Sequence, residues 1–156
     1  MRRNALAAIL LAGAALAAVP ALAEPFESNP NLAATDADFA AAKQAMDKKN
    51  WPEAQKRFEA ALKRNPDSAD LQNYLGYTHR NLKQFDLAFK YYKRAIELEP
   101  RHRGAHEYIG EAYLLVNDLP NAEKHLTALR GICLLPCEEL EDLEKAVTAY
   151  KAKKPG

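Results

Sequence analysis

Two pairs of side chains in this sequence have the types and spacing of reactive or metal-binding groups. Cys133 and Cys137, the only two cysteines, stand four positions apart, and thiolates at such a spacing bind soft metals such as Cu(I) or form a redox-active disulfide. His102 and His106 are also four positions apart, so a helix would turn both imidazoles to one face, where they could hold a divalent metal. The chain therefore offers a candidate metal or redox site at each pair.

The sequence around these pairs does not complete a known reactive motif. No third ligand follows His102 and His106 at metal-site spacing, so we interpret them as surface residues, and His79 and His125 as structural or surface residues. The cysteines have no thioredoxin-like strand and helix around them, and no Cys-x-x-Cys-His haem motif is present. A nucleophile motif, a glycine-rich phosphate loop and a catalytic carboxylate pair are also missing. We therefore expect a protein that is not an enzyme and that has no metal or other cofactor.

The segment 1–23 has the pattern of a secretory signal peptide. Two arginines precede a short apolar run at 5–19, and Ala-Leu-Ala at 21–23 supplies a small-x-small cleavage site. Retention of the run as a membrane anchor is the alternative, although the run is short and mostly alanine. Cleavage removes two of the 22 basic side chains and none of the 21 acidic ones, and this near-neutral balance excludes a nucleic-acid binder that works through bulk charge. We expect export to a bacterial periplasm, without a stable membrane span after cleavage.

The predicted compartment affects how the cysteine pair is interpreted. Disulfides persist in the periplasm, so an even pair in an exported chain is most often a structural bridge. Pro136 interrupts the helical ladder between Cys133 and Cys137, which frees the backbone to bring their Cα atoms within about 4.4–6.8 Å. We predict a disulfide that fixes the direction of the following segment. A metal-binding or redox-active thiol pair and free thiols remain open.

The strongest pattern in the sequence is a repeat with a period of about 34 residues. Small, basic, bulky apolar and proline residues recur in register: Ala54, Ala88 and Ala122; Lys56, Lys90 and Lys124; Phe58, Tyr92 and Leu126; Pro66 and Pro100. We predict six repeat helices at about 36–48, 52–64, 69–82, 85–98, 103–116 and 119–130. Small residues should let paired helices approach closely, so Gly76 and Gly110 are expected to face Ala88 and Ala122.

This period and these residue types resemble the tetratricopeptide repeat. Ala54-x3-Phe58 with Pro66 and Ala88-x3-Tyr92 with Pro100 match the second half of its pattern. Leu75-Gly76 and Ile109-Gly110-x2-Tyr113 match part of the first half. The resemblance implies an all-α, right-handed α-solenoid of three repeats, over about 35–68, 69–102 and 103–135, after a flexible lead-in at 24–34.

A seventh helix is predicted from about Pro136 to Lys151, within a final segment of 136–156. Acidic residues crowd its start and lysines its end, which complements the helix dipole. Apolar side chains form one stripe at helical spacing: Leu140, Leu143, Val147 and Tyr150. We interpret this segment as a capping helix that covers the last repeat, and not as a binding element.

The resemblance also implies a binding surface on the first helix of each repeat. In tetratricopeptide proteins these helices line a concave groove that usually holds a peptide or an extended segment. The positions it implies here are Asp36, Phe39, Lys43, Asp70, Asn73, Tyr77, Arg80, Asn81, Glu107 and Glu111. An ordinary solvated face is the alternative. One variant of the family binds the terminal carboxylate of chaperones, but Glu107 and Glu111 would repel a carboxylate, so a ligand with positive character near the third repeat is expected.

Two functions from different classes follow from these patterns. The first is a periplasmic adaptor that binds a protein or peptide of unknown identity in its groove, without nucleic acid. The second is a thiol-based metal-binding or redox protein that uses Cys133 and Cys137. Self-association through exposed helices is a third possibility.

Overall fold

The computed structural model describes residues 35–153 of the 156-residue chain, and every regular element in that range is an α-helix. The helices are α2 (Ala37–Asp47), α3 (Trp51–Arg64), α4 (Ala69–Asn81), α5 (Phe85–Leu98), α6 (Arg103–Leu115), α7 (Leu119–Ile132) and α8 (Glu138–Lys153). They agree with the seven predicted helices to within two residues at each end, so the all-α fold with a final extra helix is confirmed. The predicted signal peptide (1–23), the lead-in (24–34) and residues 154–156 lie outside the described part. None of the described helices is long and apolar enough to cross a membrane.

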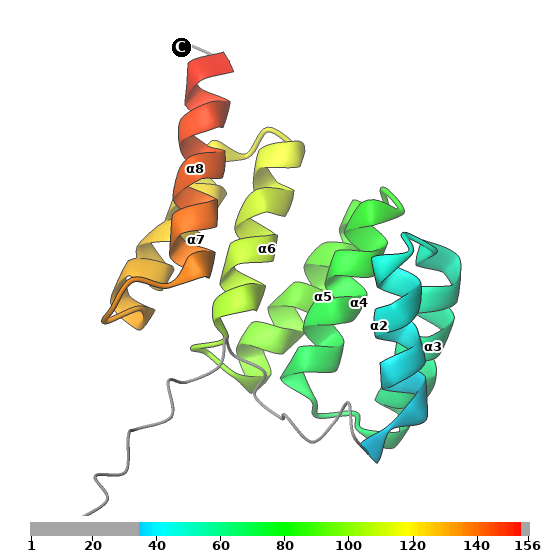
Figure 1. The fold of residues 1–156 in the computed structure, drawn as a ribbon. Coiled ribbons are helices and arrows are strands. Elements are labelled where there is room, and N and C mark those ends of the chain that lie inside the picture. The colour runs from blue at the N-terminus through cyan, green and yellow to red at the C-terminus, as the bar shows by residue number, and fades with distance from the viewer. Residues whose placement is uncertain (1–34, 154–156) are drawn as a thin grey trace, which may run out of the picture.

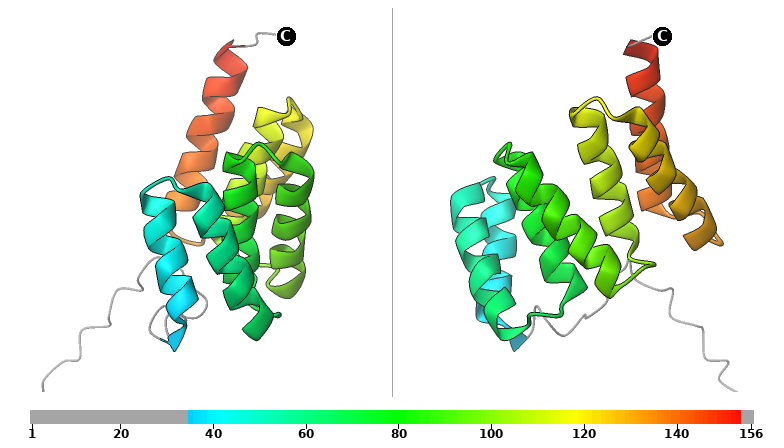
Figure 2. Two further views of the ribbon diagram at one scale, coloured as in Figure 1. Left: turned by 90° about the vertical axis from the view of Figure 1, so that its right-hand side faces the viewer. Right: turned by 180° about the vertical axis from the view of Figure 1, so that it is seen from behind.

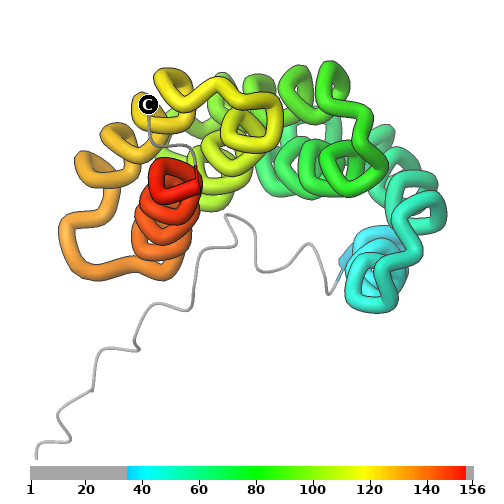
Figure 3. The backbone as a smooth tube through the Cα atoms, turned by 90° about the horizontal axis from the view of Figure 1, so that it is seen from above, coloured from blue at the N-terminus to red at the C-terminus, as the bar shows by residue number. Residues whose placement is uncertain are grey.

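The helices stand side by side (Figure 1). They form two rows that together make an arc. Consecutive helices pack against one another, and α8 packs against both α6 and α7. The second members of the pairs, α3, α5 and α7, form the outer row, as the turned views show (Figure 2). We call α2, α4, α6 and α8 the inner row, because they lie on the concave side of the arc (Figure 3).

The turn inside each helix pair repeats one backbone conformation. Lys49, Lys83 and Asn117, which occupy the same position in successive repeats, have φ angles of 55°, 63° and 63°, in the left-handed region that few side chains favour. The residue after each of them donates its N–H to a carbonyl five positions earlier, at 2.8–2.9 Å: Asn50 to Ala45, Gln84 to His79, and Asp118 to Tyr113. This is the hydrogen bonding of a Schellman helix end, and it reverses the chain identically in each repeat.

Side-chain caps fix where most of the helices begin. Asn50, Ser68, His102 and Asp118 each accept a hydrogen bond from the backbone N–H three residues later. Proline occupies one of the first two positions of α3 and α7, where a missing N–H costs no helical hydrogen bond. These local signals explain why the helix starts were readable from the sequence.

The core consists of apolar clusters between successive pairs. Phe39, Phe58 and Leu75 are at most 1% exposed and join α2, α3 and α4. Tyr92 and Ile109 occupy the equivalent position between α5 and α6. Each cluster therefore joins a helix pair to the next one, which is how a solenoid gains stability from neighbouring repeats.

The nearest neighbours of Gly76 and Gly110 are bulky side chains. A Cβ atom on Gly76 would lie 2.5 Å from the ring of Tyr92 on α5, and one on Gly110 would lie 2.7 Å from Leu143 on α8. The absence of a Cβ atom on each glycine lets a large side chain rest directly on the helix backbone. In the third repeat that side chain comes from the final helix. The expected approach of Ala88 and Ala122 stays a prediction.

Gly76→Ala should therefore destabilise the protein by about 1–2 kcal/mol, although alanine is the better helix former. The added methyl would overlap the fully buried ring of Tyr92. Gly131→Ala is the matched control, because a Cβ atom there meets nothing within 4 Å, and this change should be neutral or slightly stabilising. Urea denaturation of both variants measures the two effects; equal stabilities would contradict the close approach.

The last helix covers the end of the stack. Leu143 is fully buried and Val147 is 4% exposed, and both pack in one cluster with Leu126 and Leu129 of α7. Arg130 of α7 donates to Glu144 of α8 at 2.9 Å on the surface. The apolar stripe of α8 thus takes the place that a fourth repeat would occupy.

Candidate functional site

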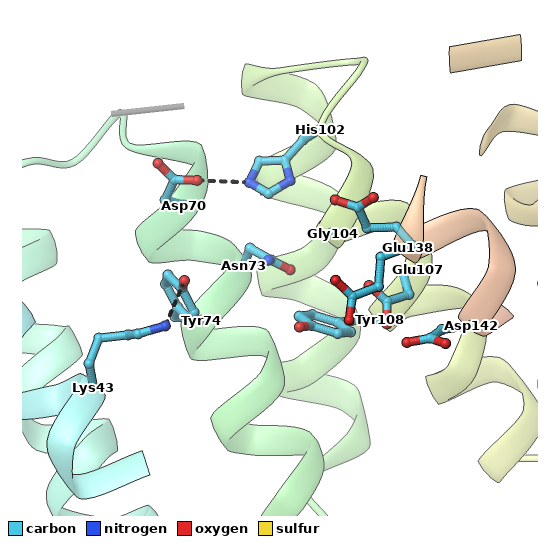
Figure 4. A pocket seen from close by; sticks show the side chains of 11 residues that line it. Lys43, Asp70, Asn73, Tyr74, His102, Gly104, Glu107, Tyr108, Glu138 and Asp142 are labelled. Atoms are coloured by element: carbon cyan, nitrogen blue, oxygen red, sulfur yellow. Dashed lines mark hydrogen bonds and ion pairs between the residues drawn. The ribbon is translucent and has the colours of Figure 1, made fainter. Parts of the chain in front are cut away.

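A cavity of about 320 Å³ opens on the concave side of the arc. All four helices of the inner row contribute to its wall, and no outer helix does. Its lining is predominantly polar: Lys43, Asp70, Asn73, Tyr74, His102, Gly104, Glu107, Tyr108, Glu138, Glu139 and Asp142 (Figure 4). The stacking of the helices therefore brings polar side chains from all four inner helices into one site.

One end of this cavity is acidic. Glu107 of α6 is 8% exposed and makes no hydrogen bond or ion pair with another described residue. The first turns of α8 add three carboxyl groups: Glu138, Glu139 and Asp142. Burial, followed by repulsion from Glu111, Asp142 and Glu139, raises the pKa of Glu107 to about 8. The Glu107 carboxyl group is therefore mostly protonated at pH 7 in the free protein.

A buried amide lies across the cavity from these carboxyl groups. Asn73 of α4 is 5% exposed, and its Oδ1 has no hydrogen-bond partner. Its amide reaches from α4 toward the acidic end, with the oxygen on that side (Figure 4). A buried acceptor without a donor costs about 1–3 kcal/mol, which a ligand N–H would recover.

The opposite end is held by internal hydrogen bonds. Lys43 of α2 donates to the hydroxyl of Tyr74 at 3.0 Å. His102 Nδ1 accepts from the Ala105 N–H at 3.1 Å, so the ring proton is on Nε2, which lies 3.1 Å from Asp70 and donates to its carboxylate. This buried pair connects the start of α6 to the start of α4 and sets the spacing of the cavity walls.

The family model of the tetratricopeptide repeat matches residues 39–98 and 79–133, which together span more than half of the chain. The chain belongs to the tetratricopeptide repeat family. Its predicted family membership is thereby confirmed.

Each of two similar curated proteins matches less than half of this chain and a small part of its own length. The chain is 35% identical over 75 residues to human protein O-mannosyl-transferase TMTC3, a stretch that is 48% of this chain and 8% of that protein. It is 32% identical over 65 residues to the general transcriptional corepressor ssn6 of Schizosaccharomyces pombe, which is 42% of this chain and 6% of the corepressor. The chain therefore spans less than a tenth of the length of these curated relatives.

Two solved structures are similar in fold. The TPR2B domain of yeast Sti1, in its pHsp70 complex, superposes with a TM-score of 0.69 at 20% identity and covers 75% of this chain and 95% of its own. The type III secretion translocator chaperone SycD of Yersinia enterocolitica gives a TM-score of 0.69 at 20% identity, with 83% and 98% coverage. At this identity the similarity shows the fold alone.

Four of the predicted groove residues of this tetratricopeptide repeat protein line the cavity: Lys43, Asp70, Asn73 and Glu107. Phe39 does not, because its ring is 1% exposed in the core against Phe58 and Tyr74. Asp36 does not either, since it caps α2 and binds Arg64 of α3 at 2.7 Å. For these two positions the groove interpretation is wrong, because side chains at the start of α2 turn toward α3 and the core.

The other predicted groove residues form a bridge between α4 and α6. The Arg80 guanidinium lies 4.8 Å from the ring centroid of Tyr77 and 5.5 Å from that of Tyr108, and it pairs with Glu111. Asn81 donates to the backbone carbonyl of Tyr77 at 2.8 Å. Replacing Tyr77 or Arg80 would therefore disturb the stack itself, so these positions are unsuitable for testing ligand binding.

Several cavity residues were not predicted as site residues. Tyr74, Tyr108 and His102 come from α4 and α6, and the carboxyl groups of α8 add Glu138, Glu139 and Asp142. The interpretation of α8 as a cap alone was therefore incomplete, since its first turns also border the cavity. The cluster of acidic residues at its start was the available signal, and we assigned it to the helix dipole only.

The histidines do not form a metal site in the described chain. His102 and His106 are 2% and 6% exposed, so the expectation of surface residues was wrong. His106 Nε2 lies 3.1 Å from the Pro100 carbonyl and its Nδ1 lies 3.0 Å from His125 Nδ1, whereas His102 faces Asp70. Burial lowers the pKa of both His106 and His125. No group of three or more His, Cys, Asp or Glu side chains suited to a metal occurs in residues 35–153.

Cys133 and Cys137 connect α7 to α8. The structure joins them as a disulfide with Cα atoms 6.1 Å apart, and Cys137 is 8% exposed. We predict no reactive thiol in the protein purified and unfolded without reductant, and two after reduction. Two thiols before reduction would favour the redox or metal function. Because the loop is short, reduction should cost only about 2 kcal/mol or less.

Proposed function

We propose that this protein is a non-catalytic adaptor that binds an extended peptide or protein segment along its concave face. The observation that carries the proposal is the cavity to which all four inner helices contribute, with the unpaired acceptor of Asn73 buried in its wall. An extended segment presents backbone N–H groups at regular intervals, and such a donor would satisfy Asn73 Oδ1.

The relatives of similar fold support a protein ligand. The Sti1 domain was solved in its pHsp70 complex, and SycD is a translocator chaperone. For this chain, however, the acidic end of the cavity argues against a terminal carboxylate as ligand, because the carboxylates of α8 would repel it and would keep Glu107 from ionising beside it.

We also propose that the adaptor acts in a bacterial periplasm. The sequence pattern of residues 1–23 supports this location, and the cysteine pair fits an oxidising compartment. Fusion of residues 1–30 to a reporter that is active only after export tests it. Activity that depends on Arg2 and Arg3 is the expected result, and an inactive reporter would refute the location.

Selection of random displayed peptides on the full chain tests the groove. We expect selected peptides to bind Asn73→Leu at least about tenfold more weakly than the wild type, because leucine has similar volume but no acceptor. The Asn73 Oδ1 atom has no partner, so this change should leave folding intact. Gln55→Leu on the outer helix α3 is the control and should bind normally. Selection of no peptide, or equal binding to Asn73→Leu, would refute the groove.

A further inference from the structure

We propose that the acidic end of the cavity is a subsite for a lysine or arginine side chain of the segment bound in the groove. This inference rests on the proposed function, because it assigns the chemistry of the ligand at one place in the same cavity. The subsite consists of the Glu107 carboxylate as the counter-ion and Asn73 Oδ1 as an additional acceptor, since an amide oxygen has two lone pairs and can accept from the side chain and from a backbone N–H together.

The charges around Glu107 come from the helices packed against it, and they leave it without a counter-ion. On α4, Asp70 pairs with His102, and Arg80 forms an ion pair with Glu111 of α6. Arg103 at the start of α6 lies 3.7 Å from Glu139 of α8. On α8, Glu138 pairs with no basic side chain of the described residues, and Asp142 binds the exposed Lys145 at 3.0 Å. The nearby bases are therefore engaged elsewhere, and the net charge at this end is negative.

A second observation, independent of these charges, indicates a ligand with N–H donors. The Asn73 amide is more than nine-tenths buried, its Oδ1 lacks a partner, and it is aimed at the carboxyl groups (Figure 4). Since a carboxylate and an amide oxygen are both acceptors, the complementary group must carry several donors. A lysine ammonium has three and an arginine guanidinium has five.

The surroundings favour an organic cation over a metal ion. Among the described residues no three His, Cys, Asp or Glu side chains converge as metal ligands. The ring of Tyr108 lies beside Glu107 at this end of the cavity (Figure 4), and an aromatic wall suits the apolar stem of a lysine or the plane of a guanidinium. The negative charge of the cavity, its acceptor atoms and its aromatic wall therefore all favour a basic side chain as the ligand.

Ligand binding through this subsite must release a proton. Because burial and repulsion raise the pKa of Glu107 to about 8, the free protein binds a proton there that a cationic ligand would displace. The affinity for a basic peptide should therefore rise by up to about tenfold per pH unit from pH 6 to pH 8, and level off above it. In Glu107→Gln this pH dependence should disappear.

The test compares the peptides selected on the wild type with those selected on Glu107→Gln. We expect one position to be enriched in lysine or arginine on the wild type only. A selected peptide and its analogue with glutamine at that position should differ by about 10- to 100-fold in affinity for the wild type and by less than about threefold for Glu107→Gln. Glu97→Gln on α5, whose side chain is 65% exposed outside the cavity, is the control and should behave as the wild type.

The outcomes separate this inference from the proposed function. Peptides that bind through Asn73 but show no enrichment of lysine or arginine would overturn the subsite and leave the groove intact. Enrichment that persists in Glu107→Gln would overturn it too. Failure to select any peptide would overturn the groove and the subsite together. Circular dichroism of each variant checks that the helices are retained.

Discussion

Removal of α8 is expected to lower the free energy of unfolding by about 3–6 kcal/mol. Leu143 and Val147 lose their burial, at about 1.5–3 kcal/mol each, and Leu126 and Leu129 of α7 become exposed. Total stabilities of domains are only about 5–15 kcal/mol, so the shortened chain should melt roughly 10 °C lower or not fold at all. The reason is that three repeats leave one open apolar face, which α8 covers.

The measurement is thermal and urea denaturation of a chain that ends after Cys137, which keeps both cysteines. Leu143→Ala tests the capping contact in a chain of full length. It should lower the free energy of unfolding by about 2–4 kcal/mol, because it leaves a void above Gly110. Thr148→Ala, at an exposed position of the same helix, should change stability by less than about 0.5 kcal/mol. An unchanged melting temperature of the shortened chain would refute the capping role.

The second large effect is expected from Glu107→Gln, which should stabilise the free protein by about 2–3 kcal/mol at pH 8. The pKa of this carboxyl group is raised from an ordinary value of 4.5 to about 8 on folding. Between these two values the folded state holds a proton that the unfolded state has released, so stability falls as the pH rises through this window. Glutamine resembles the protonated form at every pH and avoids that loss.

Urea denaturation at pH 5 and pH 8 checks this prediction. The difference between the wild type and Glu107→Gln should be below about 1 kcal/mol at pH 5 and reach its maximum near pH 8. The expected difference in the free energy of unfolding is smaller than the full pKa shift of Glu107 implies, because the ionised carboxylate can move toward the cavity mouth and water. Glu97→Gln should show no such pH dependence. A destabilised Glu107→Gln at pH 8 would mean that the carboxylate is already compensated in the free protein.

The helices were predictable because the same local sequence signals recur in each repeat. Apolar spacing, N-caps and prolines recur from one repeat to the next, so an ambiguous boundary in one repeat is settled by another. The turn was less readable. Lys49, Lys83 and Asn117 share a left-handed backbone without the glycine that usually marks it, and the hydrogen bonds of the turn involve backbone atoms only. Only their common position within the repeat indicates that the three turns are alike.

The site was predictable where the repeat register alone decides which way a side chain faces. Asn73 and Glu107 occupy the same column of successive repeats and both line the cavity. Phe39 and Asp36 show the limit, because the first helix has no preceding repeat and its side chains turn to α3. The contribution of α8 depends on the angle at which it leaves α7, which no periodic pattern encodes. The pairing of His106 with His125 likewise joins side chains from two different helices.

Chemical-shift mapping can show directly whether an extended segment binds along the inner row of helices. A selected peptide would be titrated into the isotope-labelled full chain, and its effects on the backbone amides recorded. We predict the largest shifts at Lys43, Asn73, Gly104 and Tyr108, on α2, α4 and α6. Shifts confined to outer residues such as Lys90 and Tyr91 of α5 would contradict it.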